Sequence, residues 1–206
     1  MMNEEAHVFS ERALKQRERI LEAARTCFVK RGLHGASIAD IAQEAGMSPG
    51  LMYRYFANKH AIIKAIIDRQ IESGRKALEE IKSSKDLVEG ILNAIEGWRG
   101  DSADQMSAPL FLEISAEATR DPEIAATVQE ADQLIRDHLL QTMRRTTASK
   151  TVYEDPRRAH SRITLLMCMV HGLAVRSCRE PHFDRELLHS ALSKFIAGLQ
   201  SEPTGD

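Results

Sequence analysis

Apolar residues recur at helical spacing through most of this chain. Between Arg17 and Gly32, for example, Ile20, Ala24 and Phe28 come every four positions, which places them on one face of a helix. The same spacing and the usual start signals predict further helices over 37–45, 49–55, 58–82, 86–98, 106–119, 122–145, 156–179 and 184–200. No run alternates Val, Ile and Thr with polar residues as a strand does. The pattern therefore predicts an all-α fold of about nine helices.

The segment over 37–56 has the pattern of two short helices joined by a tight turn. Ser37 is a good N-cap for the first helix, and Gly46 fits a left-handed C-terminal cap. Ser48 and Pro49 then supply a second N-cap and a proline at the first helical position. Helices separated by so short a glycine-containing turn cross steeply, as in a helix-turn-helix that offers its second helix to the DNA major groove.

The second helix of this pair combines aromatic and basic side chains. Met52 and Phe56 lie four positions apart, so they are expected to face the core. The outer side would then carry Leu51, Tyr53, Arg54 and Tyr55. Lys59 follows in the first turn of the next helix, where a cation opposes the helix dipole unless a phosphate binds there. These features favour contact with a nucleic-acid backbone.

The stretch from 17 to 67 resembles the tetracycline-repressor (TetR) family of bacterial transcription regulators. The matching features are Ser37, the turn with Gly46 and Ser48, and the run with Tyr53, Tyr55, Phe56 and Lys59. By this resemblance the phosphate contacts are expected from Ser37, Ser48, Tyr53, Tyr55 and Lys59, and the positions nearest the bases are Pro49, Gly50, Leu51 and Arg54. The resemblance also implies an all-α subunit, a homodimer and a small-molecule effector bound outside the DNA-binding part.

Two domains are expected. Residues 1–57 would form the DNA-binding part, with a mobile arm over 1–11, and 58–206 the ligand-binding and dimerisation part. From Arg12 to Lys64 there are ten Lys and Arg but four Asp and Glu, a charge of +6, which leaves −8 for the rest of a chain whose total is −2. A basic surface suits a DNA partner, although charge runs are commonly just solvated faces. In the arm, two glutamates disfavour insertion into a minor groove.

Composition and cysteine usage indicate a soluble cytoplasmic protein. Hydrophobic residues make up 43% of the 206 positions, which is enough for a core. The cysteines Cys27, Cys168 and Cys178 have no paired spacing and fit reduced thiols, with Cys27 read as a buried small hydrophobe in preference to a redox sensor. The longest apolar run, 163–175, is too short to cross a bilayer, so neither a membrane partner nor a signal peptide is expected.

The last two helices are apolar over more than one side. One chain of this size has too few other helices to cover both, so a four-helix bundle with a second copy is the economical explanation. The interface is predicted to include Ile163, Leu166, Val170, Leu188, Leu192 and Phe195. Burial of the same residues inside a single subunit is the alternative.

Candidate chemistry outside the DNA-binding part is sparse. Soft apolar walls predict a small-molecule pocket, whose residues would be Trp98, Met106, Phe111, Glu113, Met143, Met167, Cys168 and His171. Methionines and aromatics at this spacing are also common in plain cores. Glu113 and Glu117 lie four apart without a ligand histidine at helical spacing, so neither a metal nor a cofactor is expected. The sequence contains no catalytic motif, and an enzyme is not expected.

Together these features predict a ligand-responsive repressor that binds a near-palindromic double-stranded DNA operator as a homodimer. Two-fold symmetry would place its recognition helices about 34–36 Å apart, which is one turn of DNA. Two alternatives stay open, namely a DNA-binding protein regulated by a partner protein, and a helical enzyme or lipid carrier with an incidental helix-turn-helix. The residues do not determine the effector, the operator sequence, or activation as against repression.

Overall fold

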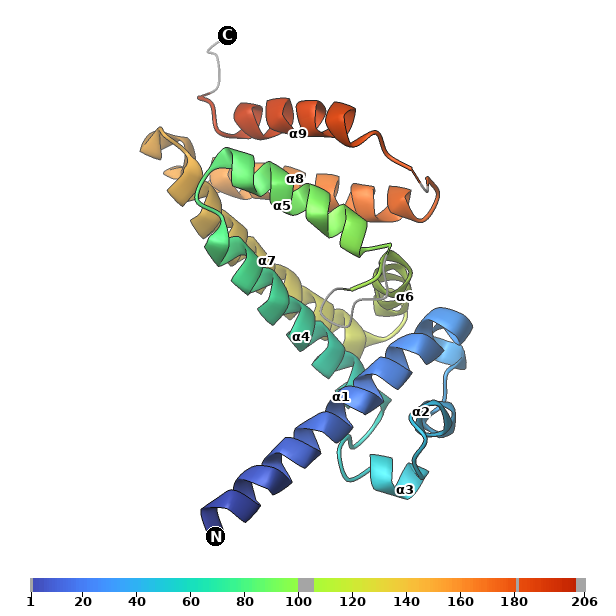
Figure 1. Cartoon of the computed structure of the whole chain (residues 1–206). Helices are drawn as coiled ribbons and strands as arrows, with labels where there is room; N and C mark the ends of the chain where they lie inside the picture. The colour runs from blue at the N-terminus through green and yellow to red at the C-terminus, as the bar shows by residue number, and fades with distance from the viewer. Residues whose placement is uncertain (1, 100–105, 181, 203–206) are drawn as a thin grey trace. The chain divides into compact units, whose positions relative to one another are not determined.

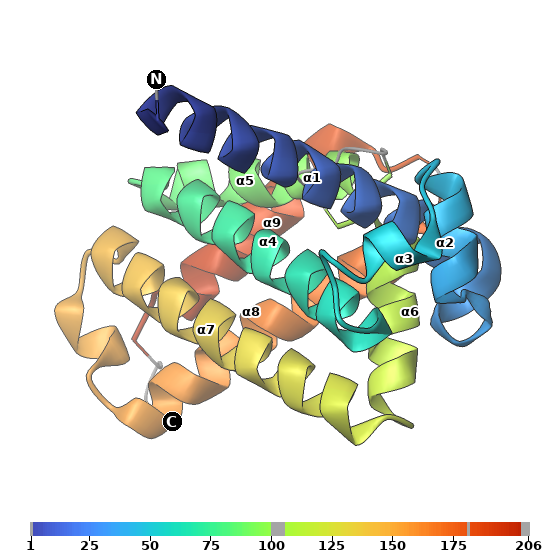
Figure 2. The same cartoon turned by 90° about the horizontal axis from the view of Figure 1, so that it is seen from below.

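The computed structural model describes residues 2–99, 106–180 and 182–202, with side chains from 11 onward except at 150. In chain order the helices are α1 (Met2–Gly35), α2 (Ile38–Glu44), α3 (Pro49–Met52), α4 (Lys59–Glu80), α5 (Ser84–Gly97), α6 (Ala108–Ala118), α7 (Pro122–Thr146), the 3-10 helix η1 (Lys150–Tyr153), α8 (Pro156–Ser177) and α9 (Arg185–Leu199) (Figures 1 and 2). These residues form no strand, so the all-α prediction is confirmed for the described part of the chain. None of the described helices is long and apolar enough to cross a bilayer.

The chain forms two compact units. Unit 1 consists of 1–68 and 109–128, and unit 2 of 69–108 and 129–206. The boundaries lie inside α4, after the first residue of α6 and inside α7, so α4 and α7 contribute several residues to both units. This division differs from the one expected at 57, because α6 and the start of α7 join the N-terminal helices. Spacing along a sequence contains no signal for such long-range packing.

Unit 1 is organised around α1. Ile20, Ala24 and Phe28 are each 0% exposed, which confirms the four-residue repeat as the buried face of this helix. α2 packs against α1 and α3 against α2, and Figures 1 and 2 both place the pair beside α1. Gly32 has a φ of +74°, so it interrupts the helical path of α1 where the sequence predicted a stop.

The N-terminal end of α1 is longer than the sequence predicted. Residues 2–10 have no apolar repeat and are expected to form an arm, but their backbone is helical from Met2. The segment includes Glu4, Glu5 and Ala6, whose intrinsic preference favours helix without any buried face. A search for periodicity misses a helix of this kind.

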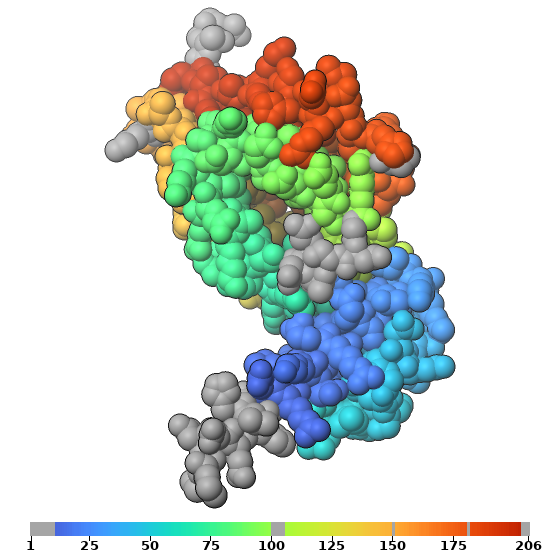
Figure 3. Space-filling view, in the orientation of Figure 1, coloured from blue at the N-terminus to red at the C-terminus, as the bar shows by residue number. Residues whose placement is uncertain are grey.

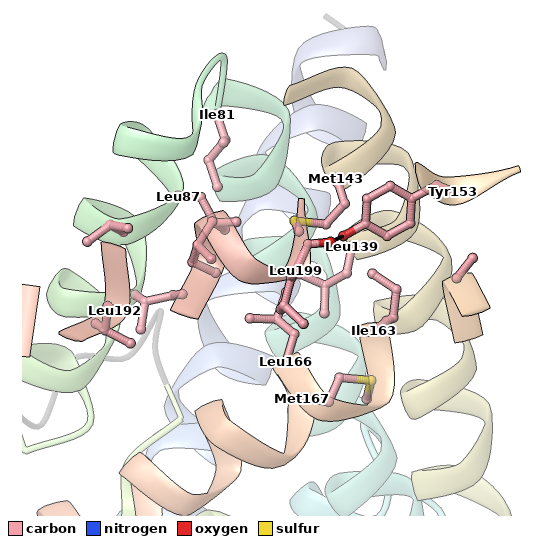
Figure 4. Close-up of a cluster of buried hydrophobic side chains, with 14 of the residues drawn as sticks. Ile81, Leu87, Leu139, Met143, Tyr153, Ile163, Leu166, Met167, Leu192 and Leu199 are labelled. Carbon is pink, nitrogen blue, oxygen red and sulfur yellow. Dashed lines mark hydrogen bonds between the residues drawn. The ribbon is translucent and has the colours of Figure 1, made fainter. Parts of the chain in front are cut away.

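Unit 2 encloses a core of side chains from α5, α7, η1, α8 and α9 (Figure 4). Tyr153 enters this core from η1, a helix that the sequence did not predict, and it is 1% exposed. Its hydroxyl donates a hydrogen bond of 3.0 Å to the carbonyl of Leu199. Burial raises the pKa of Tyr153 to about 12, because the phenolate loses its solvation there.

Charged groups join the start of α9 to α5 within unit 2. Arg185 donates hydrogen bonds of 2.9 Å to Glu89 and 3.1 Å to Asn93, and it also pairs with Glu96. Asp184, the predicted N-cap, accepts from the backbone N–H of Leu187 at 3.0 Å. The predicted start of α9 is therefore confirmed by its cap.

Candidate nucleic-acid interface

A reciprocal pair of hydrogen bonds fixes the start of α2. The Ser37 hydroxyl oxygen accepts from the Asp40 N–H at 3.1 Å, and the Asp40 carboxylate accepts from the Ser37 N–H at 2.9 Å. The Ser37 hydroxyl also donates to Asp40 at 2.6 Å, and Arg31 pairs with the same carboxylate. The bonds from Ser37 and the charge of Arg31 lower the pKa of Asp40. Since the Ser37 hydroxyl already has an anionic partner, its predicted phosphate contact would require that bond to open.

The turn between α2 and α3 is closed by Gly46. Its φ of +61° is in the left-handed region, as the sequence predicted for this glycine. The Met47 N–H donates to the Ala42 carbonyl at 2.9 Å and the Gly46 N–H to Gln43 at 3.0 Å, which satisfies carbonyls at the end of α2. A Cβ at Gly46 would lie 2.5 Å from a guanidinium nitrogen of Arg19, so this arginine lies across the turn.

α3 is shorter than predicted but begins and packs as expected. The Ser48 hydroxyl accepts from the Leu51 N–H at 3.3 Å, and Pro49 occupies the first helical position. Met52 and Phe56 are 1% and 4% exposed, which confirms that they face the core. The helix ends at Met52, and Tyr53 to Phe56 continue as hydrogen-bonded turns, with the Phe56 N–H donating to Met52 at 3.1 Å.

The opposite side of α3 and its following turn is the reading surface, defined as 48–51 and 53–55. Its exposed members are Ser48, Pro49, Gly50, Tyr53 and Arg54, and its half-buried ones are Leu51 and Tyr55. Figure 3 shows the cyan atoms of this segment at the surface of unit 1. Tyr53 is 55% exposed, and a Cβ added at Gly50 would meet no atom within 4 Å. The predicted DNA-facing side chains of this segment are therefore accessible.

Lys59 has a structural task that the sequence did not indicate. Its ammonium donates to the carbonyls of Leu33 at 2.7 Å and Ala36 at 3.3 Å, so it satisfies the end of α1. The side chain is half-buried and directed at the protein, whereas the sequence suggested that a phosphate would relieve its position at the start of α4. An ammonium has three N–H donors, so one donor is left for a phosphate when two bond the carbonyls. The phosphate contact of Lys59 stays a prediction.

Comparisons with known proteins show the family to which this chain belongs. Residues 20–66 match the family model described as "Bacterial regulatory proteins, tetR family". Residues 94–201, more than half of the chain, match the model described as "BetI-type transcriptional repressor, C-terminal". The chain belongs to the TetR family. The match over 20–66 contains α2 and α3, the pair that the sequence predicted to form a helix-turn-helix.

Individual relatives agree with this assignment. HTH-type transcriptional regulator UidR from Escherichia coli (strain K12) is 35% identical over 132 residues, which are 62% of this chain and 64% of UidR. The structure of Salmonella enterica GusR matches with a TM-score of 0.71 at 26% identity, over 91% of this chain and 96% of that one. A putative transcriptional regulator from Pseudomonas aeruginosa PAO1 shares the fold, with a TM-score of 0.71 at 19% identity over 89% of each chain. The matched stretch spans less than two thirds of UidR, so it establishes kinship and not a shared effector.

Glu113 of α6 and Asp121, the residue before α7, contact α1 and α4 within unit 1. A Glu113 carboxylate oxygen accepts from the backbone N–H of Leu33 at 3.1 Å, directly after the break at Gly32. His60, in the first turn of α4, lies 2.8 Å from the Asp121 carboxylate, and this hydrogen bond is the main cause that lowers the pKa of Asp121. One oxygen of Glu113 is therefore a backbone acceptor, which the sequence did not indicate, and its role as the polar anchor of a pocket stays a prediction.

The other predicted pocket residues have mixed positions. Met143 and Met167 are 0% and 5% exposed within the core of unit 2, so the plain-core alternative describes them better. Cys168 is exposed on α8, and its place in a pocket wall stays a prediction. Trp98, Phe111 and His171 are half-buried, and Met106 is buried. No group of three or more metal-ligating side chains occurs among the described residues.

Several predicted dimer-interface residues are core residues of unit 2 instead. Ile163 and Leu166 are 0% exposed and Leu192 is 3% exposed, so a partner subunit could not reach them. Val170, Leu188 and Phe195 are partly buried against the same core. On α8 and α9 the large apolar side chains that stay exposed include Leu165 and Leu187, at 56% and 71%. The sequence showed that both helices are apolar on several sides but not which side faces inward.

Proposed function

We propose that this TetR-family protein is a ligand-responsive repressor that binds a near-palindromic operator as a homodimer in the cytoplasm. The observation that carries the proposal is the reading surface, where Tyr53 and Arg54 point outward from a turn held from behind by Met52 and Phe56. Tyrosine hydroxyls donate to phosphate oxygens, and a guanidinium can donate two hydrogen bonds to a guanine edge.

Repression is supported by the match of 94–201 to a model whose description names a transcriptional repressor. A repressor needs only to occupy its operator, so the proposal requires no surface for recruiting other proteins. Activation would require such a surface in addition.

Dimerisation is supported by the leucines that unit 2 leaves uncovered. Leu165 and Leu187 expose large apolar side chains on α8 and α9, and exposed apolar patches commonly mark association surfaces. An isologous contact through these helices would give two-fold symmetry. Two reading surfaces would then meet two operator half-sites about 34–36 Å apart.

Effector control is supported by half-buried polar chemistry in unit 2. Burial lowers the pKa of His171, and the nearby charge of Asp132 opposes this shift, so the imidazole is neutral near pH 7. A neutral imidazole can donate and accept a hydrogen bond to an uncharged ligand. Such a ligand would release the operator only to the extent that it binds the non-DNA-binding conformation more tightly.

A gel-shift titration against the DNA upstream of the protein's own gene tests the proposal. We expect a sequence-selective complex that weakens as salt rises, because phosphate contacts release counterions. A footprint repeated with candidate compounds would then identify the operator and any releasing ligand. Absence of any salt-sensitive, sequence-selective complex would favour the helical enzyme or carrier alternative.

The base-reading part is tested at Arg54. Arg54→Ala should relax the sequence preference at one operator position by about 1–3 kcal/mol, the usual worth of a bidentate base contact. Tyr53→Phe is the matched comparison, since loss of a phosphate contact should weaken operator and random DNA by similar factors. An Arg54 variant with the parental sequence preference would contradict base readout.

A thermal-shift screen separates ligand control from control by a partner protein. Stabilisation by a compound that also dissociates the operator complex would support a small-molecule effector. Release of DNA by a cellular protein, with no compound that stabilises the chain, would support the partner-protein alternative.

A further inference from the structure

Arg17 links α1 to the end of the reading surface. One guanidinium nitrogen donates a hydrogen bond of 2.9 Å to the backbone carbonyl of Tyr55. The same guanidinium lies over the Phe56 ring, with 4.3 Å from its central carbon to the ring centroid. Phe56 is 4% exposed and Arg17 is half-buried, so both contacts lie at the edge of the core of unit 1.

The segment that Arg17 holds has little internal support. α3 has four residues, and helices this short do not persist without tertiary contacts. Its turn is fixed from the core side by Met52 and Phe56, while the Tyr55 carbonyl lies at the end of the turn where no further helical N–H follows. A guanidinium at this carbonyl supplies the missing donor and complements the negative end of the peptide dipoles.

From these contacts we propose that Arg17 is a positioning residue for DNA binding. It acts through the turn over 53–56 and fixes the directions in which Tyr53 and Tyr55 present their hydroxyls. This positioning role requires both contacts. The stacking on Phe56 sets the plane of the guanidinium, and the hydrogen bond to Tyr55 sets its position. The role rests on the proposed DNA contacts of the two tyrosines.

A direct phosphate contact is the competing role, since a guanidinium has further N–H donors. The two roles differ in what they depend on. A phosphate contact of Arg17 works whether or not the tyrosines have hydroxyls, whereas a positioning residue has less to position once those hydroxyls are removed.

A double-mutant cycle on operator affinity distinguishes them. Arg17→Ala is measured in the unmodified protein and in the Tyr53→Phe, Tyr55→Phe background, using the operator fragment found by footprinting. We expect a loss of about tenfold or more in the unmodified protein and a loss at least threefold smaller in the tyrosine-less background, because coupled residues are not additive. Losses that agree within threefold in the two backgrounds would overturn the positioning role in favour of direct contact.

Arg12→Ala is the matched control for charge. It removes the same positive charge from an exposed position of α1 and should cost at least threefold less affinity than Arg17→Ala. Equal losses would mean that only the charge of α1 matters, and would overturn the proposal. If circular dichroism shows that Arg17→Ala is unfolded, the same cycle with Arg17→Lys gives the answer, since lysine keeps the charge but cannot both bond and stack as a planar group.

The outcomes separate this inference from the proposed function. An unmodified protein that binds operator tightly, with Arg17→Ala binding equally well, removes the positioning role and leaves the regulator intact. An unmodified protein that binds no DNA at all removes the proposed function, and the role of Arg17 falls with it.

Discussion

Two glycines on the DNA-binding side show that a residue type can be required for different reasons. Gly46 has a φ of +61°, so the fold itself needs a residue without a Cβ at the turn. Gly50 has no such conformation, and space around its Cα is open within the protein. The protein alone therefore does not explain a glycine at position 50, whereas the proposed close approach of DNA to the backbone would explain it.

Gly50→Ala should separate stability from DNA affinity. We expect the free energy of unfolding to stay the same or rise by up to about 1 kcal/mol, because alanine is the better helix former. Operator affinity should fall about tenfold or more as the added methyl meets the DNA, at roughly 1.4 kcal/mol per factor of ten. Urea unfolding and fluorescence anisotropy measure the two quantities.

Gly74→Ala is the control for that prediction, since position 74 lies inside α4 and is equally open. It should show the same gain in stability and no change in affinity. Unchanged operator binding by Gly50→Ala would remove Gly50 from the reading surface.

Tyr153 makes a prediction about alkaline pH. Its raised pKa of about 12 means that the unfolded chain ionises first, so its contribution to stability is complete below about pH 10 and is lost between about pH 10 and 12. The loss over that window is up to about 2.7 kcal/mol, from roughly two pKa units at 1.36 kcal/mol each. Tyr153→Phe should lose about 1 kcal/mol at pH 7, from the bond to Leu199, but lack the alkaline decline. Parallel pH profiles for both proteins in urea unfolding would contradict this account.

At the scale of helices, the sequence predicted which helices exist and where they begin better than it predicted which side of each helix faces the core. Asp184 was recognisable as an N-cap because capping is local chemistry within three residues. The inward side of α8 was not, since Leu165 and Leu166 look equally apolar and differ in exposure only through what packs on them. η1 and the first residues of α1 were not predicted as helices because neither has an apolar repeat.

The contact between Glu113 and α1 belongs to the same scale and has no sequence signal at all, because 80 positions separate the partners. It ties α6 to the break that follows Gly32. A shift of α6 within unit 1 would therefore move the end of α1, and through the bond from Lys59 to Leu33 it would also move the start of α4.

Glu113→Ala should lower the free energy of unfolding by about 1–3 kcal/mol, because the Leu33 N–H loses its acceptor beside a side chain that is 1% exposed. Glu113→Gln keeps an acceptor oxygen and should lose less than half as much. Glu117→Ala is the control on the same helix, since it removes a carboxylate that pairs with the Arg120 side chain. Equal effects of Glu113→Ala and Glu117→Ala in urea unfolding would mean that the bond to Leu33 contributes nothing.

At the scale of the whole molecule, exposure corrects where a second subunit could bind. The apolar stripes over 163–175 and 187–199 correctly indicated helices that are covered on several sides. Much of that cover comes from unit 2 itself, which buries Ile163, Leu166 and Leu192. Leu165 and Leu187 stay exposed on these two helices and are the positions that we propose for contact with a partner.

Leu165→Asp and Leu187→Asp should each give a folded monomer with much weaker operator binding, because only one half-site can be held at a time. Leu166→Asp should instead unfold the protein, since it buries a charge in a core position that is 0% exposed. Sedimentation velocity with circular dichroism distinguishes the three variants. Folded dimers of both exposed-leucine variants would place the interface elsewhere on the chain.

The shortness of α3 has a consequence for how such regulators diversify. Its outward positions 49–51 and 54 are separate from the two anchors, Met52 and Phe56, that hold the turn in place. Exchange of those few positions for the equivalents of another regulator should therefore redirect this protein to a foreign promoter while the rest of the scaffold stays unaltered. The DNA sequence that the protein recognises could then be changed by exchanging one helical turn. A series of such variants would give regulators that each bind a different operator.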